Sequence, residues 1–201
     1  MRCKFSLVAL VIVAAVTALP PAPARAADDA ASFIAGLGTQ ALQILSSQQP
    51  EAEREKQFRA LFDKAFDEDT IGRFALGPYW RTATEAQRQE FIRLFVTYIV
   101  HVYTVRLTAF TDQQFKVTGS RRESENSTIV TSQATSAGSE APTHIDWRVV
   151  KTENGFKITD VIVEGVSMAI TERQEFAAVI QRAGGNIEAL LKILREKIGQ
   201  G

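Results

Sequence analysis

Residues 160–168, Asp-Val-Ile-Val-Glu-Gly-Val-Ser-Met, decide how this chain folds, because they join a β-strand to a helix in one short segment. The β-branched residues before the glycine predict a strand, and a capping pattern that begins at Thr171 predicts a helix. Gly165 is expected to permit the break between the two. Asp160 and Ser167 are expected to satisfy nearby backbone groups. The segment is therefore predicted to be structural and not catalytic.

The residues before this segment have the two-residue alternation of β-strands, which predicts an antiparallel sheet. Apolar and polar residues alternate, and β-branched residues are frequent. Asn154-Gly155 is a strong signal for a tight hairpin turn. Short loops also join the other segments, which implies that neighbours in sequence pair side by side. The strands are expected at 115–121, 128–135, 143–151 and 156–163.

Helical periodicity brackets the sheet on both sides. Gly184-Gly185 separates two C-terminal helices, and Asn186 is placed to cap the second. The chain is therefore predicted to be α+β. N-terminal helices and a C-terminal helix pair pack on one face of an antiparallel sheet of four to five strands, with an apolar pocket between. The expected helices are 31–47, one from 51 onward, a short one at 67–75, 84–110, 171–182 and 186–197.

The helix expected at 84–110 has almost no polar face. A helix that is apolar all round is normally buried all round. Arg93, His101 and Arg106 interrupt it at short intervals, so it is not expected to span a membrane. Two layers must therefore cover it, the sheet on one side and helices or a ligand on the other.

The first residues have the pattern of a cleaved signal peptide. Arg2 and Lys4 precede a short apolar run, and Ala24-Arg25-Ala26 is a typical cleavage site. Residues 1–26 are therefore expected to be removed, leaving residues 27–201 as a single domain. That domain has no cysteine, and it carries 20 basic residues against 23 acidic ones. The slight acidic excess argues against nucleic acid and against an anionic bilayer surface as partners. No stable membrane insertion is expected.

Catalytic and metal-binding patterns are weak. His144 and Asp146 lie on one face of a strand and form the best acid–base candidate, yet such pairs are common on exposed strands. His101 is expected to be a core or pocket-edge residue. Gly36-Leu37-Gly38 lies inside a helix without a preceding strand, so it indicates close packing and not a dinucleotide site. No catalytic residue, metal site or cofactor is predicted.

A second block of residues completes a family pattern. Leu76-Gly77-Pro78-Tyr79-Trp80 is followed, after a short spacer, by Thr84-x-x-Gln87-Arg88, and the long helix ends in Tyr103-x-x-x-Leu107. Together with Glu164 to Met168 and the segment 183–191, this order resembles the periplasmic phospholipid-binding proteins of the MlaC type, also known as toluene-tolerance auxiliary components. The resemblance covers most of residues 55–198.

The resemblance implies a carrier and not an enzyme. Members of this family look like soluble periplasmic shuttles that carry phospholipid between the outer and inner membranes. They exchange it with an outer-membrane lipoprotein complex and with an inner-membrane ABC transporter that has an MCE-type subunit. The expected cavity lies between helix 84–110 and the inner sheet face. Its expected lipid-binding walls are Leu94, Tyr98, Val102, Ile145, Trp147, Val161, Val163 and Val166.

Three alternatives stay open at this point. Phe156 and Thr159 depart from the family pattern, which makes a hopanoid-like lipid, associated with one subgroup, a second possible cargo. A small-molecule enzyme of the NTF2-like kind would need an acid–base pair such as His144 and Asp146. A structural adaptor would have the same elements around a filled core.

Overall fold

The computed structural model describes residues 22–108, 114–135 and 141–199, with side chains described from residue 27 and omitted at 105–108. Most of the expected signal peptide therefore lies outside the described residues. Within them the chain forms six α-helices, one 3₁₀ turn and a five-stranded sheet, which confirms the α+β class. The elements are α1 (Ala22–Leu45), α2 (Glu51–Ala65), α3 (Glu68–Leu76), η1 (Gly77–Trp80), α4 (Glu85–Thr108), β1 (Gln114–Arg122), β2 (Ser127–Thr135), β3 (Thr143–Thr152), β4 (Gly155–Val163), β5 (Val166–Ser167), α5 (Met168–Arg182) and α6 (Ile187–Ile198).

The sheet is an antiparallel meander in the order β1-β2-β3-β4-β5, as the short loops predicted. The hairpin at Asn154-Gly155 is present, and Thr152 Oγ1 donates to the Gly155 carbonyl at 2.8 Å. A second tight turn joins β4 to β5 through Glu164 and Gly165, whose φ angles are 49° and 80°. Two successive positive φ values are those of a type I′ hairpin turn. Gly165 therefore reverses a strand before the chain enters the helix.

A β-bulge in β4 explains why the alternation of the sequence weakens there. Arg148 pairs with Asp160 but Val149 pairs with Ile158, so Thr159 is an extra residue on β4. The extra residue interrupts the alternation, so each side chain after the bulge points to the sheet face opposite to the one that residue counting predicts. Val161 consequently shares a sheet face with Ile158, three positions before it.

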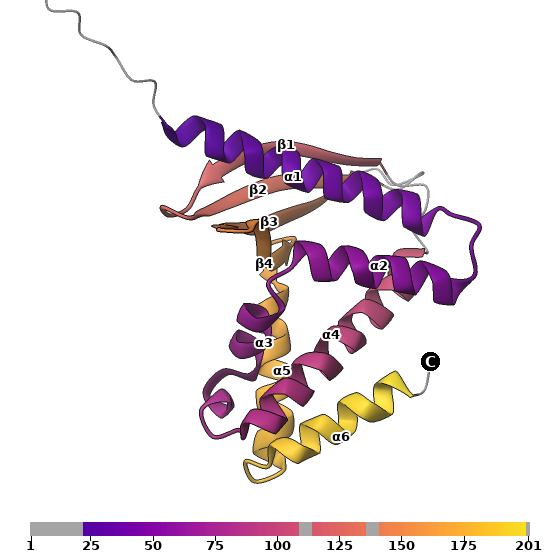
Figure 1. Cartoon of the computed structure of the whole chain (residues 1–201), viewed down its shortest axis with the longest axis vertical. Coiled ribbons are helices and arrows are strands. Elements are labelled where there is room, and N and C mark those ends of the chain that lie inside the picture. Colours follow the sequence, from indigo (N-terminus) through magenta and orange to yellow (C-terminus); the bar gives the residue numbers. More distant parts are fainter. Residues whose placement is uncertain (1–21, 109–113, 136–140, 200–201) are drawn as a thin grey trace, which may run out of the picture.

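The apolar residues form two cores. Helix α1 lies along the sheet in Figure 1, and Ala30 and Ile34 pack there with Val130, Val149 and Ile158. Below the sheet in that view, α3, α4, α5 and α6 pack with the end of α2 around a second core that includes Phe91, Phe95, Phe176, Leu190 and Leu191. Of the C-terminal pair that was expected on the sheet, α5 contacts β4 and β5, whereas α6 packs on α4 and α5.

Helix α4 begins as its sequence predicts. Thr84 N–H donates to Gln87 Oε1 at 3.0 Å and Gln87 N–H donates to Thr84 Oγ1 at 3.2 Å, which is a capping box. From Leu94 to Thr104 each residue is buried or half-buried. The helix is therefore covered on all sides over its central turns.

Helix α5 begins earlier than Thr171, and this prediction was wrong. Ser167 is the N-cap: its Oγ accepts from Ile170 N–H at 3.1 Å. Thr171 lies in the first turn and donates its hydroxyl to the Ser167 carbonyl at 2.9 Å. Thr171 and Gln174 have the residue types of a capping box, but the preceding hairpin has already placed Ser167 at the helix end.

Candidate functional site

An apolar cavity of about 240 Å³ lies where α2, α4 and α5 meet β3 and β4. It is lined by aromatic and aliphatic side chains, with few polar groups. From the helices these are Phe58, Phe62, Phe66, Ile71, Phe95, Ile99, Tyr103, Met168 and Ala169, and from the strands Ile145, Trp147, Val161 and Val163; the polar members are Thr159, Asp160 and Glu172. A wall of this composition binds apolar groups by removing them from water.

Helix α2 and its C-cap supply three phenylalanines to the wall. Phe58 and Phe62 are one turn apart on the helix, and Phe66 is the extended C-cap residue that follows it. The rings of Phe62 and Phe66 are stacked, with centroids 4.1 Å apart. The four-residue spacing of these phenylalanines is visible in the sequence, but helical periodicity alone assigns them to ordinary core packing.

Helix α4 contributes a different stripe from the expected one. Phe95, Ile99 and Tyr103 face the cavity, each one residue after the expected Leu94, Tyr98 and Val102. Among the described residues, neither cavity of this molecule includes that expected trio in its lining. Leu94 and Tyr98 pack on the helical core, and Lys197 of α6 lies 5.3 Å above the Tyr98 ring.

Four expected residues do come together on the sheet side. Ile145 pairs with Val163, and Trp147 pairs with Val161, so the four side chains lie on one face of β3 and β4. The β-bulge at Thr159 brings Val161 to this face. Val166, in contrast, lies on the edge strand β5 with 54% of its surface exposed, away from the cavity.

A second cavity, of about 160 Å³, lies between α1, α2 and the sheet. It shares Phe58, Phe62, Phe66, Ile145 and Trp147 with the first cavity. Its other walls are equally apolar: Leu37, Gly38, Ala41, Leu42, Leu45, Leu61, Phe115 and Ala134. Apolar side chains therefore line two adjacent cavities, one in the helical layer and one beneath α1.

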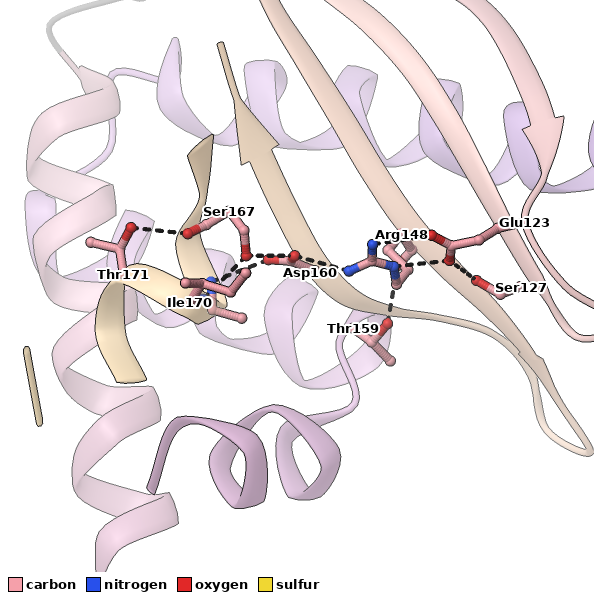
Figure 2. A network of polar contacts seen from close by, with 9 residues as sticks. Glu123, Ser127, Arg148, Thr159, Asp160, Ser167, Ile170 and Thr171 are labelled. Atoms are coloured by element: carbon pink, nitrogen blue, oxygen red, sulfur yellow. Dashed lines mark hydrogen bonds and ion pairs between the residues drawn. The ribbon is translucent and has the colours of Figure 1, made fainter. Parts of the chain in front are cut away.

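Asp160, one of two charged residues in the cavity wall, is held by hydrogen bonds. The Asp160 carboxylate accepts from Ala169 N–H at 3.1 Å, from the Ser167 hydroxyl at 2.7 Å and from Arg148 at 3.1 Å. Figure 2 shows its contacts with Ser167 and Arg148. Its side chain is 4% exposed. Asp160 and Ser167 thus satisfy local groups at the strand-to-helix seam, as the sequence predicted. A carboxylate held in this way is a poor general base.

Arg148 extends this network to the protein surface. Its guanidinium donates to both oxygens of Glu123, at 2.9 and 3.1 Å, as well as to Asp160 (Figure 2). The hydrogen bond from Arg148 is the main reason that the pKa of Glu123 is lowered, and Glu123 in turn raises the pKa of Arg148. The network therefore places one guanidinium between two carboxylates, so that each carboxylate has a cationic partner beside the cavity.

The acid–base candidate lies outside the cavity. Side chains of successive strand residues point to opposite faces, so His144 and Asp146 face away from Ile145 and Trp147. Asp146 accepts from the Thr131 hydroxyl at 2.7 Å, and His144 is exposed. Within the described part of the chain, no cluster of three or more His, Cys, Asp or Glu residues is arranged to hold a metal. The cavity thus has the means to enclose an apolar molecule and little with which to react.

Across the portion of the chain that the structure describes, no helix combines the length and the apolar character needed to cross a bilayer.

This chain is similar to a family model, to a relative and to a solved structure. The family model described as MlaC protein matches residues 37–196. The intermembrane phospholipid transport system binding protein MlaC of Haemophilus influenzae is 23% identical over 132 residues, which are 64% of this chain and 61% of that protein. A phospholipid-binding protein from Ralstonia solanacearum, solved in complex with a phospholipid, superposes with a TM-score of 0.74 at 24% identity, over 86% of this chain and 98% of that chain. This chain thus spans about three fifths of the length of the Haemophilus relative and has the fold of the Ralstonia structure.

Proposed function

This chain belongs to the MlaC family, and we propose that it is a periplasmic carrier that holds phospholipid by its acyl chains and performs no chemistry on it. The single observation that carries the proposal is the apolar cavity between α2, α4, α5 and the sheet. The relatives are described as phospholipid-binding proteins, which agrees with a cavity of this composition.

The energetics of lipid extraction favour an apolar cavity over a polar site. Moving an acyl chain from a membrane into water costs about 0.8 kcal/mol of free energy per methylene, or on the order of 12 kcal/mol for a sixteen-carbon chain. A hydrogen bond returns only about 1 kcal/mol. Ile145, Trp147, Val161 and Val163, together with the phenylalanines of α2, supply apolar contact in place of the membrane interior. The polar headgroup needs no charged pocket in this scheme and stays near water.

The proposed partners follow from the family. The Haemophilus relative is named as part of an intermembrane phospholipid transport system. We propose that this chain likewise exchanges lipid with an outer-membrane lipoprotein complex and with an inner-membrane ABC transporter that has an MCE-type subunit. Export would remove residues 1–26 and leave α1 from Ala27 onward, including the buried Ala30 and Ile34 that fix it on the sheet.

A matched pair of variants tests the carrier. Val163 lines the cavity, whereas Val166, across the same hairpin turn, is 54% exposed. Val163→Trp is expected to fill the cavity and to reduce the phospholipid that co-purifies from the periplasm by about tenfold or more, since an indole displaces several methylenes. Val166→Trp is expected to retain it.

Native mass spectrometry measures the bound lipid, and thermal melting shows that both variants are folded. Wild-type protein that carries no lipid, and takes none from phospholipid vesicles, would refute the proposed function. Bound hopanoid in place of phospholipid would keep the carrier and change its cargo.

A further inference from the structure

The two cavities are divided by a shared set of side chains. Phe58 and Phe62 of α2, its C-cap residue Phe66, and Ile145 and Trp147 of β3 line both. The remaining walls come from α4, α5 and β4 for one cavity and largely from α1 and β1 for the other. These five side chains, called the partition below, therefore stand between the two apolar spaces.

Trp147 is the member of the partition whose orientation is fixed by a hydrogen bond. Its Nε1 donates to Ser132 Oγ at 2.8 Å. The same hydroxyl donates to the Ile145 carbonyl at 3.1 Å, and Ser132 is completely buried. An indole N–H in an apolar interior needs such a partner, so the bond selects one ring orientation over the others.

Packing supports the ring from a second side. The edge of Phe115 meets the Trp147 ring at 80°, with centroids 6.2 Å apart. Phe115 reaches this position by lying directly against the backbone of α1 at Gly38, where a side chain would overlap its ring. The indole is thus held by Ser132 through its nitrogen and by Phe115 through ring contact.

We propose that Ser132 is a positioning residue: by holding Trp147 in the partition, it sets how long an apolar chain the cavities accept. The inference rests on the proposed function, because it concerns the lipid that the carrier holds. When the indole is fixed, a chain that is too long must leave its last methylenes in water. When the indole can turn, the two spaces join and the longer chain is accepted.

A competition experiment measures this effect. Purified protein is exposed to vesicles with equal amounts of two phosphatidylglycerols that have C16 or C18 chains, and the bound lipids are counted by native mass spectrometry. One methylene moved from water into the cavity changes the ratio about fourfold. Ser132→Ala is therefore expected to shift the C18 to C16 ratio upward by at least about fourfold relative to wild type.

Thr131→Ala is the matched control. Thr131 is the neighbouring residue on β2, faces the other side of the sheet, and loses one hydrogen bond, the 2.7 Å contact with Asp146. Its lipid ratio is expected to equal that of wild type. A ratio in Ser132→Ala that matches the Thr131→Ala ratio would overturn the inference.

Two further readouts separate positioning from a general loss of structure. Trp80 and Trp147 are the two tryptophans of the chain, so in a Trp80→Phe background the residual fluorescence anisotropy reports on the Trp147 ring alone. Ser132→Ala is expected to lower it. The double variant Ser132→Ala/Trp147→Phe is expected to show the same lipid ratio as Trp147→Phe, because Ser132 acts through the indole.

The outcomes distinguish the two proposals. Wild-type protein that takes up neither lipid refutes the carrier and the positioning role together. Wild-type protein that takes up lipid, with an unchanged anisotropy in Ser132→Ala or with additive effects in the double variant, refutes only the positioning role.

Discussion

Asp160 Oδ2 lies 2.7 Å from Ser167 Oγ, and this contact joins the last full strand of the sheet to the first turn of α5. The other oxygen of Asp160 accepts from Ala169 N–H at 3.1 Å, so one carboxylate satisfies both a capping hydroxyl and a helix N–H. Negative charge at a helix N-terminus is also favourable. The segment from Asp160 to Met168 therefore holds α5 at a fixed angle to the sheet, beside the cavity that both help to line.

Replacing Asp160 is expected to destabilise the fold. Asp160→Ala leaves the Ser167 hydroxyl and Ala169 N–H without their acceptor and removes the buried partner of Arg148. We expect a loss of about 3 kcal/mol in the free energy of unfolding, measured by urea denaturation. Glu123→Ala removes the more exposed partner of the same arginine and is expected to cost less than about 1 kcal/mol. Equal losses in the two variants would contradict this ranking.

Glu68 is expected to make stability depend on pH. Burial, followed by the neighbouring Asp63 carboxyl, raises the pKa of Glu68 from 4.5 to about 7. The folded protein therefore holds this proton more tightly than the unfolded chain. The resulting stabilisation is complete below pH 4.5 and is lost as the pH rises to about 7.

The variant Glu68→Gln isolates this effect. It is expected to raise the free energy of unfolding by roughly 2 kcal/mol at pH 8 and to leave it nearly unchanged at pH 4. Urea denaturation at the two pH values measures both numbers. A loss of stability at pH 8 would show instead that the attraction between Glu68 and Arg59, 3.9 Å apart, outweighs the cost of burial.

Gly36 and Gly38 are expected to respond in opposite ways to the same substitution. A Cβ at Gly36 meets no atom within 4 Å, so Gly36→Ala should stabilise α1 by about 0.5–1 kcal/mol through helix propensity. A Cβ at Gly38 would overlap the Phe115 ring. Gly38→Ala should therefore destabilise the protein by about 1–3 kcal/mol. Thermal unfolding of both variants checks the signs, and a stabilised Gly38→Ala would show that Phe115 moves aside freely.

The turn at Glu164 is expected to discriminate between side chains. Glu164 has a φ of 49°, which costs little for Asn and more for a β-branched residue. Its carboxylate also accepts from His144 N–H at 2.6 Å. Glu164→Asn should change stability by less than about 1 kcal/mol and Glu164→Val should lower it by about 2 kcal/mol or more. Denaturant titration gives both values, and similar values for the two would mean that the turn adopts another conformation.

Local signals in the sequence were sufficient for most of the fold. The capping box at Thr84, the hairpin at Asn154 and the cap at Asn186 each depend on residues a few positions apart, and all three are present. The start of α5 was predicted wrongly because the role of Ser167 depends on Asp160, seven positions earlier on another element. The residues around Thr171 give no indication of that contact.

The walls of the cavity were predictable on the sheet but not on α4. A strand has two faces, and Ile145 and Trp147 could be assigned to the inner one by alternation. Helix α4 is apolar on every side, so periodicity gives the four-residue spacing without the rotation about the helix axis. Leu94 and Tyr98 pack on the helical core, which includes α6. This packing turns Phe95, Ile99 and Tyr103 toward the cavity.

The two apolar cores of this protein share one side chain among the described residues, Phe66. The backbone next to it is attached to the sheet by Asp67 N–H, which donates to the Ile158 carbonyl at 2.9 Å. Both cores therefore pack against the same aromatic ring, so a change in the position of that ring reaches the helical layer and the sheet layer together.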